Sequence, residues 1–550
     1  MARVLASLSA SLLLLTACDG SPSPSDAGAP DAAPSDAGEG DAGSDAGAPA
    51  SAICAELGLP VRAFDASATG TSWESVAGDF ALDTLDGPFR LSERWSGCES
   101  YVFVAFATSD YGRGLWDGSP DLLFTEGPRN VHYFFTSWEA TEPEARARVT
   151  AMRDKVEDGF EFLAIPEAER AFWRARVHYV TTPVRSIEGS VGELVRGSAI
   201  VLNAFAITRQ QRFDPVGSLM SIRAGGFRPD LGMARFVTPY FDYLHDLDAR
   251  LEAEAAVTVV DLVRDELTAL RTIDRRVTLP TASAMAAFDT LEIDLEEVCT
   301  LRPDECSEWD RNAYVFVCED EDCAVADELV RWITPYSRPG RLRWVMDASP
   351  LLGLLRDGGA RTFRVVLGPD WERATERTVS ASLRLSTRGG RPRAVGAEIA
   401  FRGGTFDGAY NDGRAPFRFT APADTTRTEL VVIVSGHGQE PPNNCAEWCD
   451  HHHDFAVDGE NVAAIAFPGE AGRANGCAAL TGDGVPPGQW GNWSPLRAGW
   501  CPGLPVETRR FELSGVTPGV EHVLEYAGSF AGGAPPGGHI DLSAYVVYYR

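Results

Sequence analysis

The segment Cys306-Ser307-Glu308-Trp309-Asp310-Arg311 leads almost directly into Tyr314-Val315-Phe316-Val317 and sets the character of the second half of the chain. Its first part places charged and aromatic side chains beside a cysteine, and its second part has the β-branched and aromatic composition of a strand. Similar strands recur from about residue 256 onward, separated by Gly, Pro, Asn and Asp. They include residues 257–260, 362–366, 378–385, 429–434 and 545–549. We therefore predict two β-sandwiches, at residues 256–395 and 396–550.

Two further segments in this β-rich half combine an acid or an arginine with tryptophan beside a cysteine. One is Ser435-Gly436-His437-Gly438 followed by Asn444-Cys445-Ala446-Glu447-Trp448-Cys449, and the other is Gly491-Asn492-Trp493-Ser494-Pro495 followed by Arg497-Ala498-Gly499-Trp500-Cys501-Pro502-Gly503. Indole faces stack on sugar rings, while carboxylates and guanidinium groups bind hydroxyls and amides. A single such pair is usually a surface acid beside a packed indole, but three favour a carbohydrate site.

These three segments resemble, in identity, order and approximate spacing, the peptide:N-glycosidase F family. The resemblance covers about residues 285–550. It implies two adjacent eight-stranded jelly rolls with the active site in the cleft between them. The implied reaction is hydrolysis of the amide that joins N-acetylglucosamine to the side chain of asparagine, which leaves aspartate in the peptide and releases the glycan as a glycosylamine. No cofactor and no metal ion are implied.

The resemblance also assigns roles to individual residues. Asp310 matches the principal catalytic aspartate and Glu447 the essential glutamate of the other jelly roll, while Glu376 is the candidate for a third acid. The candidates for substrate binding are Arg311, Trp309, Trp448, Arg497, Trp500 and His437. His437 stands where the family typically has tryptophan, which alters one sugar-stacking surface. The competing hypothesis is a surface protein that binds glycans without turning them over.

Residues 53–245 are expected to form an α/β domain. Tyr101-Val102-Phe103-Val104-Ala105-Phe106 is typical of a buried strand, residues 142–176 contain helical stretches, and Ala199-Ile200-Val201-Leu202 begins another strand region. The order of motifs around the first strand resembles a thioredoxin-like domain. No reactive cysteine follows that strand, so such a domain would lack redox chemistry.

The N-terminus is predicted to be a lipoprotein signal. A short apolar run in residues 1–17 ends in Leu15-Thr16-Ala17, directly before Cys18. The thiol of Cys18 is the expected lipidation site. Residues 18–52 are rich in Asp, Ala, Gly, Ser and Pro and are expected to form a disordered acidic tether. We therefore expect a monomer anchored in a bacterial cell envelope, with N-linked glycoproteins or glycopeptides as substrate.

The remaining ten cysteines are expected to form disulfides, because exported proteins meet an oxidising compartment. Spacing along the chain suggests local pairs. The proposed pairs are Cys54 with Cys98, Cys299 with Cys306, Cys318 with Cys323, Cys445 with Cys449, and Cys477 with Cys501.

The net charge of -30 argues against a nucleic-acid partner, since binding phosphates requires clustered cations. His451-His452-His453 raises the question of a metal site. Strand alternation would place His451 and His453 on one face. Three consecutive histidines do not make two spaced ligand sets, so we expect a solvent-facing strand end and no metal.

Overall fold

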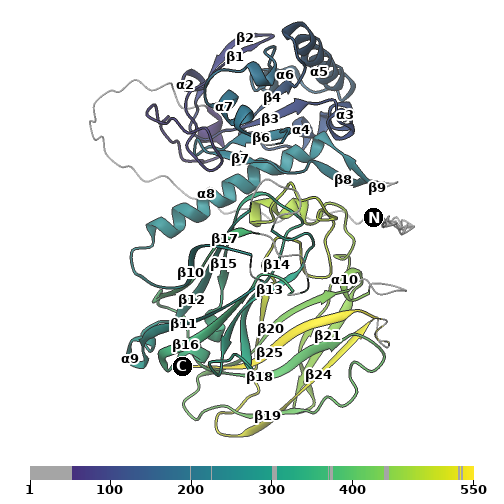
Figure 1. The fold of residues 1–550 in the computed structure, drawn as a ribbon. Coiled ribbons are helices and arrows are strands. Elements are labelled where there is room, and N and C mark those ends of the chain that lie inside the picture. The colour runs from purple at the N-terminus through teal and green to yellow at the C-terminus, as the bar shows by residue number, and fades with distance from the viewer. Residues whose placement is uncertain are drawn as a thin grey trace, which may run out of the picture.

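The computed structural model consists of an α/β unit above two β-sandwiches that lie side by side, with helix α8 across the junction (Figure 1). The structure describes residues 52–198, 200–223, 226–269, 271–299, 306–369, 371, 376–438, 445–530, 533, 535 and 537–550. The predicted signal, Cys18 and all but the last residue of the predicted tether lie outside these ranges.

The α/β unit is built on a five-stranded mixed sheet in the order β5-β4-β3-β6-β7. Strand β3 pairs in parallel with β4 and antiparallel with β6, and every residue of β3 and β4 is buried. This is the environment that the apolar run at 101–106 predicts. The strands are β1 Ala81–Thr84, β2 Gly87–Arg90, β3 Ser100–Phe106, β4 Val131–Ser137, β5 Val177–Tyr179, β6 Ala204–Ile207, β7 Phe213–Pro215, β8 Met220–Arg223 and β9 Gly226–Pro229.

Helices cover this sheet. The long helix α5 begins at a capping box, in which Thr141 and Glu144 satisfy each other's backbone donors, with proline in the first turn. The α-helices are α1 Ala52–Glu56, α2 Leu91–Arg94, α3 Asp110–Asp117, α4 Asp121–Thr125, α5 Glu142–Phe162, α6 Glu167–Arg174, α7 Gly189–Gly197 and α8 Val237–Ala253, and the 3₁₀ helices are η1 Val184–Ser186 and η2 Leu231–Phe236. Helix α8 continues past the expected domain end at 245, and the strand expected from 199 begins at Ala204 instead.

The first sandwich contains sheets β10-β17-β12-β15 and β11-β16-β13-β14. Numbered from its own first strand, the order is first-eighth-third-sixth against second-seventh-fourth-fifth, which is the jelly-roll winding that the resemblance implies. The strands are β10 Val257–Thr268, β11 Thr272–Thr281, β12 Thr290–Cys299, β13 Asn312–Cys318, β14 Ala326–Ile333, β15 Gly340–Asp347, β16 Gly358–Val366 and β17 Arg377–Ser386, with helices α9 Ala282–Met285 and η3 Ser349–Leu355.

The second sandwich repeats the same winding, in sheets β18-β25-β20-β23 and β19-β24-β21-β22. A long excursion between β22 and β23 leaves the sandwich and returns, carrying residues 466–507 towards the α/β unit. The strands are β18 Ala394–Thr405, β19 Phe417–Thr420, β20 Arg427–His437, β21 His451–Val457, β22 Glu460–Ile465, β23 Thr508–Glu512, β24 Glu521–Phe530 and β25 His539–Tyr549, with helices α10 Cys445–Trp448 and η4 Ala478–Asp483.

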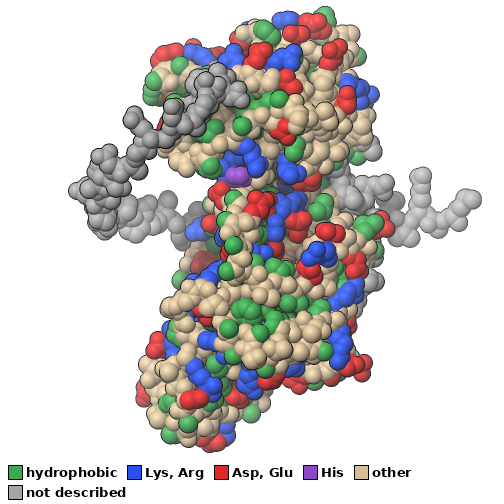
Figure 2. Space-filling model, turned by 90° about the vertical axis from the view of Figure 1, so that its left-hand side faces the viewer, with side chains coloured by type: hydrophobic (Ala, Val, Ile, Leu, Met, Phe, Trp, Pro, Cys, Tyr) green, Lys and Arg blue, Asp and Glu red, His purple; other side chains and the backbone are tan. Residues whose placement is uncertain are grey.

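Helix α8 joins the α/β unit to the first sandwich through ion pairs. Asp248 pairs with Arg341 and Arg343 of β15 at 2.7 and 2.8 Å, and Arg250 pairs with Glu292 of β12 at 2.8 Å. Figure 2 shows charged side chains gathered at the waist between the two parts. The helix is therefore fixed against the sandwich by several charged contacts at once.

The two sandwiches share a packed interface. Val431, Tyr545 and Val547 of the second sandwich belong to the same hydrophobic cluster as the core of the first. Backbone hydrogen bonds also tie the excursion to β14, since Ile333 N–H donates to Leu504 O and Val506 N–H donates to Arg331 O. The two sandwiches are thus joined directly, through residues of a shared core, and also through the hydrogen-bonded excursion.

Five disulfides link the ten cysteines in the described part of the chain, paired as their spacing predicts. Cys445–Cys449 spans helix α10, and Cys477–Cys501 closes the base of the excursion. Two segments that carry predicted site residues are therefore cross-linked close to those residues. Within the described residues, no helix combines the length and apolarity needed to cross a membrane.

Candidate active site

The two principal acids come from different sandwiches and meet at one guanidinium group. Asp310 precedes β13 of the first sandwich, and Glu447 lies on α10 of the second. Arg497 Nη2 lies 3.3 Å from Asp310 Oδ2, and Arg497 Nε lies 3.4 Å from Glu447 Oε1. Acids that are 137 positions apart in the sequence are thus brought to one buried cation.

Arg497 is fully buried within this cluster. Its guanidinium carbon lies 4.5 Å from the centre of the Trp448 ring and 5.3 Å from that of Trp500. Its Nη1 also donates to Pro495 O at 2.8 Å. Indole rings and backbone oxygen replace the water around the cation, so its orientation towards the acids is set by packing.

Burial and mutual repulsion shift the acids away from their ordinary ionisation. Loss of solvent raises the pKa of Asp310, against the opposing effect of Arg497. Burial, together with the negative charge of Asp310, raises the pKa of Glu447 to about 8. One guanidinium faces two carboxyl groups, so at neutral pH the pair holds a shared proton.

Tyr336 completes the cluster and was not singled out from the sequence. Its hydroxyl accepts a hydrogen bond from Arg497 Nη2 at 3.1 Å and donates one to Asp310. Its backbone N–H donates to Gln489 Oε1 at 2.9 Å, which fixes the strand end to the excursion. In the sequence, Tyr336 ends the run Ile333-Thr334-Pro335-Tyr336, which carries no acid, cysteine or tryptophan that would single it out.

The Ser435-Gly436-His437-Gly438 segment, whose first three residues end strand β20, supports helix α10 and Glu447. A Cβ atom at Gly436 would lie 1.7 Å from Ala446 O, so only glycine lets α10 approach β20 this closely. Gly438 N–H donates to the Glu447 carboxyl group. Trp500 Nε1–H donates to Gly436 O at 2.9 Å.

Two of the predicted sugar-binding side chains instead support the cluster. Only 3% of Trp500 is exposed, and it lies between Arg497 and His437, whose ring centre is 4.7 Å from its own. His437 bonds to Ser435 Oγ at 2.8 Å, and burial lowers its pKa to about 3. The Trp500 ring is therefore in contact with Arg497 and His437, and little of its surface is exposed for a ligand to bind.

Arg311 and two tryptophans form an exposed surface next to the acids. The Arg311 guanidinium carbon lies 4.6 Å from the Trp371 ring centre and 5.8 Å from that of Trp309. Trp309 is 42% exposed and Trp371 73% exposed. Glu376 is also exposed, and its assignment as a third acid remains a prediction because residues 372–375 before it lie outside the described ranges.

The sequence predicts a solvent-facing strand end for the histidine run, and the structure shows this prediction to be wrong. His451 and His453 share one face of β21, as alternation predicts, but that face is the interior of the sandwich. His451 Nδ1 lies 2.7 Å from His453 Nε2, and His453 Nδ1 lies 2.8 Å from Tyr526 Oη. The two imidazoles lie among the rings of Phe406, Phe467 and Tyr526 in the sandwich interior, a burial that the composition of the run could not reveal.

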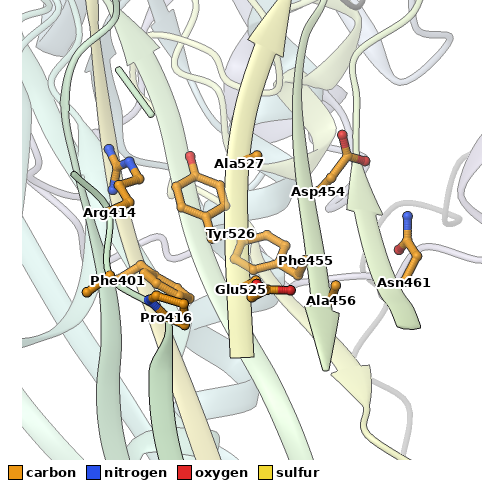
Figure 3. A pocket seen from close by; sticks show the side chains of 11 residues that line it. Phe401, Arg414, Pro416, Asp454, Phe455, Ala456, Asn461, Glu525, Tyr526 and Ala527 are labelled. Carbon is orange, nitrogen blue, oxygen red and sulfur yellow. The ribbon is translucent and has the colours of Figure 1, made fainter. Parts of the chain in front are cut away.

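A cavity of about 340 Å³ opens elsewhere on the second sandwich, beside Tyr526, Arg414 and Asp454 (Figure 3). The acids, Arg497 and the indoles described above are not among its lining residues. The cluster between the two sandwiches is therefore a better candidate for chemistry than this cavity, because it combines two acids with raised pKa values, a buried cation and flanking aromatic rings.

Comparison with known proteins points to one family. Residues 405–547 match the family model described as Peptide-N-glycosidase F, C terminal. Peptide-N(4)-(N-acetyl-beta-D-glucosaminyl)asparagine amidase F of Elizabethkingia miricola is 30% identical over 241 residues, which is 40% of this chain and 63% of the relative. The aligned region thus covers less than two thirds of that relative's length.

Solved structures of similar proteins include a crystal structure of peptide-N(4)-(N-acetyl-beta-D-glucosaminyl)asparagine amidase, 22% identical, with a TM-score of 0.44 over 54% of this chain and 96% of the other. Another is PNGase F, described as a glycosylasparaginase from Flavobacterium meningosepticum, 20% identical, with a TM-score of 0.41 over 54% and 96%. A third is PNGF-II, 14% identical, with a TM-score of 0.42 over 56% and 67%.

Proposed function

We propose that this chain, whose residues 405–547 belong to the peptide-N-glycosidase F C-terminal domain family, is an amidase that releases N-linked glycans from asparagine. The observation that carries the proposal is the meeting of Asp310 and Glu447 at Arg497. A related amidase at 30% identity supports the same reaction class. Exposed indoles beside the acids supply a surface suited to sugar rings.

In the proposed reaction, Asp310 takes a proton from a water molecule as the water oxygen attacks the side-chain carbonyl carbon. The C–N bond then breaks, and protonated Glu447 gives its proton to the departing nitrogen. Its raised pKa keeps that proton available at neutral pH. The products are aspartate in the peptide and a glycosylamine, which later decays to free glycan and ammonia.

Two arginines have separate tasks in this scheme. Arg497 holds both acids in place and limits their repulsion, since it contacts each of them. Arg311, stacked over the exposed indoles, is assigned to the substrate and to the negative charge that develops on the carbonyl oxygen. Tyr336 fixes the orientation of the Asp310 carboxylate through its hydroxyl.

The test is incubation of the full chain with a denatured N-glycoprotein in water enriched in oxygen-18. We expect free glycan, and a former glycosylation site that is aspartate carrying one labelled oxygen by mass spectrometry. Asp310→Asn is the matched control, and with this variant the glycosylation site of the substrate should remain glycosylated asparagine. Binding of the glycoprotein without conversion by the wild-type chain would instead support the glycan-binding alternative.

For the α/β unit, we propose a thioredoxin-like fold without redox function. It is supported by parallel β3 and β4 joined through helices, with the antiparallel pair β6 and β7 on the other side. At the end of β3, Ser109 caps α3 by accepting from Gly112 N–H, and Cys54 is bonded to Cys98. Thiol titration of the denatured, unreduced exported protein should find no free thiol; a free or cycling thiol would contradict this proposal.

We also propose that Cys18 anchors the chain in a cell envelope, as its position after the apolar N-terminal run indicates. Both acids of the candidate site come from one chain, which supports a monomer as the working form. Mass spectrometry of the mature N-terminus tests the anchor: an acylated Cys18 is expected, and Cys18→Ala should release the protein into the soluble fraction. A mature protein without acyl chains would exclude it.

A further inference from the structure

The α/β unit is packed into the excursion that carries Arg497. Cys477, Trp493 and Leu496 of the excursion lie in the same hydrophobic cluster as the core of the α/β unit. Ser218 N–H donates to Gly488 O at 2.7 Å. A Cβ atom at Gly217 would lie 2.4 Å from Gly488 O, so the two backbones touch directly. The α/β unit is therefore a structural neighbour of the candidate active site.

Trp490 lies at this contact. Its ring centre is 5.9 Å from that of Tyr111 on α3 of the α/β unit. Its backbone N–H donates to Tyr336 O at 3.1 Å, and the next residue, Gly491, packs against the Tyr336 ring. Trp490 is thus held between the α/β unit and the tyrosine that reaches Asp310, and it is still 41% exposed.

These side chains follow one another beside the acids, and we call them the aromatic row. Arg311 lies between Trp371 and Trp309, and the Trp309 ring centre is 6.4 Å from that of Tyr336. The backbone of Tyr336 is hydrogen-bonded to that of Trp490, whose ring contacts Tyr111. Three of its members, Trp371, Trp309 and Trp490, are the exposed tryptophans of the described residues. Isolated exposed indoles need no explanation, but three joined to one catalytic cluster indicate a binding surface.

Resting on the proposed amidase function, we propose that the aromatic row binds the outer sugars of the glycan and that the α/β unit supports its far end, where Tyr111 contacts Trp490 of the excursion. Indole faces stack on the apolar faces of pyranose rings, and an extended row matches an extended oligosaccharide. The sugar attached to asparagine lies at Asp310, and later sugars reach Trp490. Trp490 then determines preference for large glycans without taking part in bond cleavage.

The test compares the full-length wild type with Trp490→Ala on one asparagine peptide carrying either a two-sugar chitobiose or a full oligomannose glycan. We expect KM for the large glycan to rise roughly three- to tenfold, with kcat retained and with both constants unchanged for the short glycan. Phe162→Ala is the matched control, because Phe162 is an 86% exposed aromatic residue outside the row, at the end of α5 in the α/β unit.

Tyr111 provides a second arm. Tyr111→Ala should weaken binding of the large substrate in the same direction as Trp490→Ala. Tyr111→Phe keeps the ring that contacts Trp490 and loses the hydrogen bond from Leu219 N–H to the hydroxyl, so its loss should be smaller than that of Tyr111→Ala. Equal losses on both substrates, a change in kcat alone, or no change would each overturn the proposal. An effect that follows peptide length instead of glycan size would also overturn it.

A binding measurement separates this proposal from the proposed function. Titration of the free oligomannose oligosaccharide into the wild type, Trp490→Ala and Phe162→Ala needs no turnover. Weaker binding only in Trp490→Ala supports the row even if the wild type releases no glycan. Equal binding by all three proteins contradicts the row even if the amidase reaction is confirmed.

Discussion

Two buried clusters of arginine and acid lie along the join between the sandwiches, and the pKa of Asp541 in one is shifted in the opposite direction to those of Asp310 and Glu447 in the other. At Arg497 the distances to Asp310 and Glu447 are 3.3 and 3.4 Å, and the pKa values of both acids are raised. At Arg331, the guanidinium lies 2.7 Å from Glu328, and the pKa of the neighbouring Asp541 lies well below its usual range.

The two clusters differ in how far hydrogen bonds and positive charge offset the effect of burial on the pKa of the acids. Burial alone would raise the pKa of Asp541, but hydrogen bonds from His539 and Tyr314 and the charge of Arg331 outweigh it. Ser543 donates to Glu328 in the same cluster. At Arg497, burial and the charge of Asp310 outweigh the contact of Glu447 with the guanidinium, so the pKa of Glu447 is raised. Donors that outweigh burial keep Asp541 charged at the join, whereas the raised pKa of Glu447 leaves a proton available for transfer.

Removing Arg497 should have the largest effect. Arg497→Met leaves two buried carboxyl groups facing each other, so we expect undetectable glycan release and a loss of about 3–5 kcal/mol in the free energy of unfolding. Denaturant unfolding and a glycan-release assay measure the two effects. Wild-type stability in Arg497→Met would show that the guanidinium does not hold the acids.

Neutralising one acid in each cluster should separate function from stability. Asp541→Asn is expected to cost about 1–3 kcal/mol of stability while retaining most activity, because a well-bonded carboxylate is lost. Glu447→Gln should abolish activity without lowering the melting temperature at neutral pH, because Gln has no proton to donate but matches the uncharged form that Glu447 holds there. Similar behaviour of the two variants in calorimetry and activity assays would mean that the clusters do not differ as described.

The pH dependence should reflect the shared proton. The folded-state pKa of Glu447, about 8, lies above its ordinary 4.5, so its contribution to stability is full below pH 4.5 and is lost as pH rises towards 8. Glu447→Gln mimics the protonated form, so its stability relative to wild type should grow over that range, by at most ~1.4 kcal/mol per pH unit. Wild-type kcat should fall above pH 8. A flat profile to pH 10 would contradict the proton-donor role.

The buried histidines should make the second sandwich sensitive to acid. Burial lowers the pKa of His451 to about 4, so the stability that its neutral form provides is present above pH 6.5 and is lost as pH falls to 4. His451→Gln should reduce this loss, by at most about 3 kcal/mol. Thermal melts at pH 7 and pH 4.5 measure it, with the exposed His452→Gln as control; identical losses in both variants would exclude His451 as the cause.

Much of this organisation could be read from the sequence because it is local. The β-branched and aromatic composition of segments such as 312–318 predicts the strands that the structure contains. Cysteines a few residues apart, such as Cys318 and Cys323, predict a disulfide across a turn. Asp310 and Glu447 stand in segments with tryptophan and cysteine, and the family resemblance assigned their roles. Their meeting at Arg497 depends on how the two sandwiches pack against each other, which no local pattern specifies.

Other features depend on tertiary packing and leave no local pattern. Tyr336 acts through a hydroxyl at the end of β14, and its sequence neighbourhood is that of any strand end. The burial of His451 and His453 depends on Tyr526, 73 residues from His453. The contact between Gly217 and Gly488 joins the α/β unit to the excursion, and the residues next to each glycine in the sequence do not predict this contact.

The most direct test of the central claim is the rate at which Asp310→Asn releases glycan from a denatured N-glycoprotein, measured beside wild type under the same conditions. The account predicts at least a roughly hundredfold fall in rate, with a melting temperature equal to or above that of wild type. Glycan release at the wild-type rate by the folded variant would contradict a catalytic site between the two sandwiches.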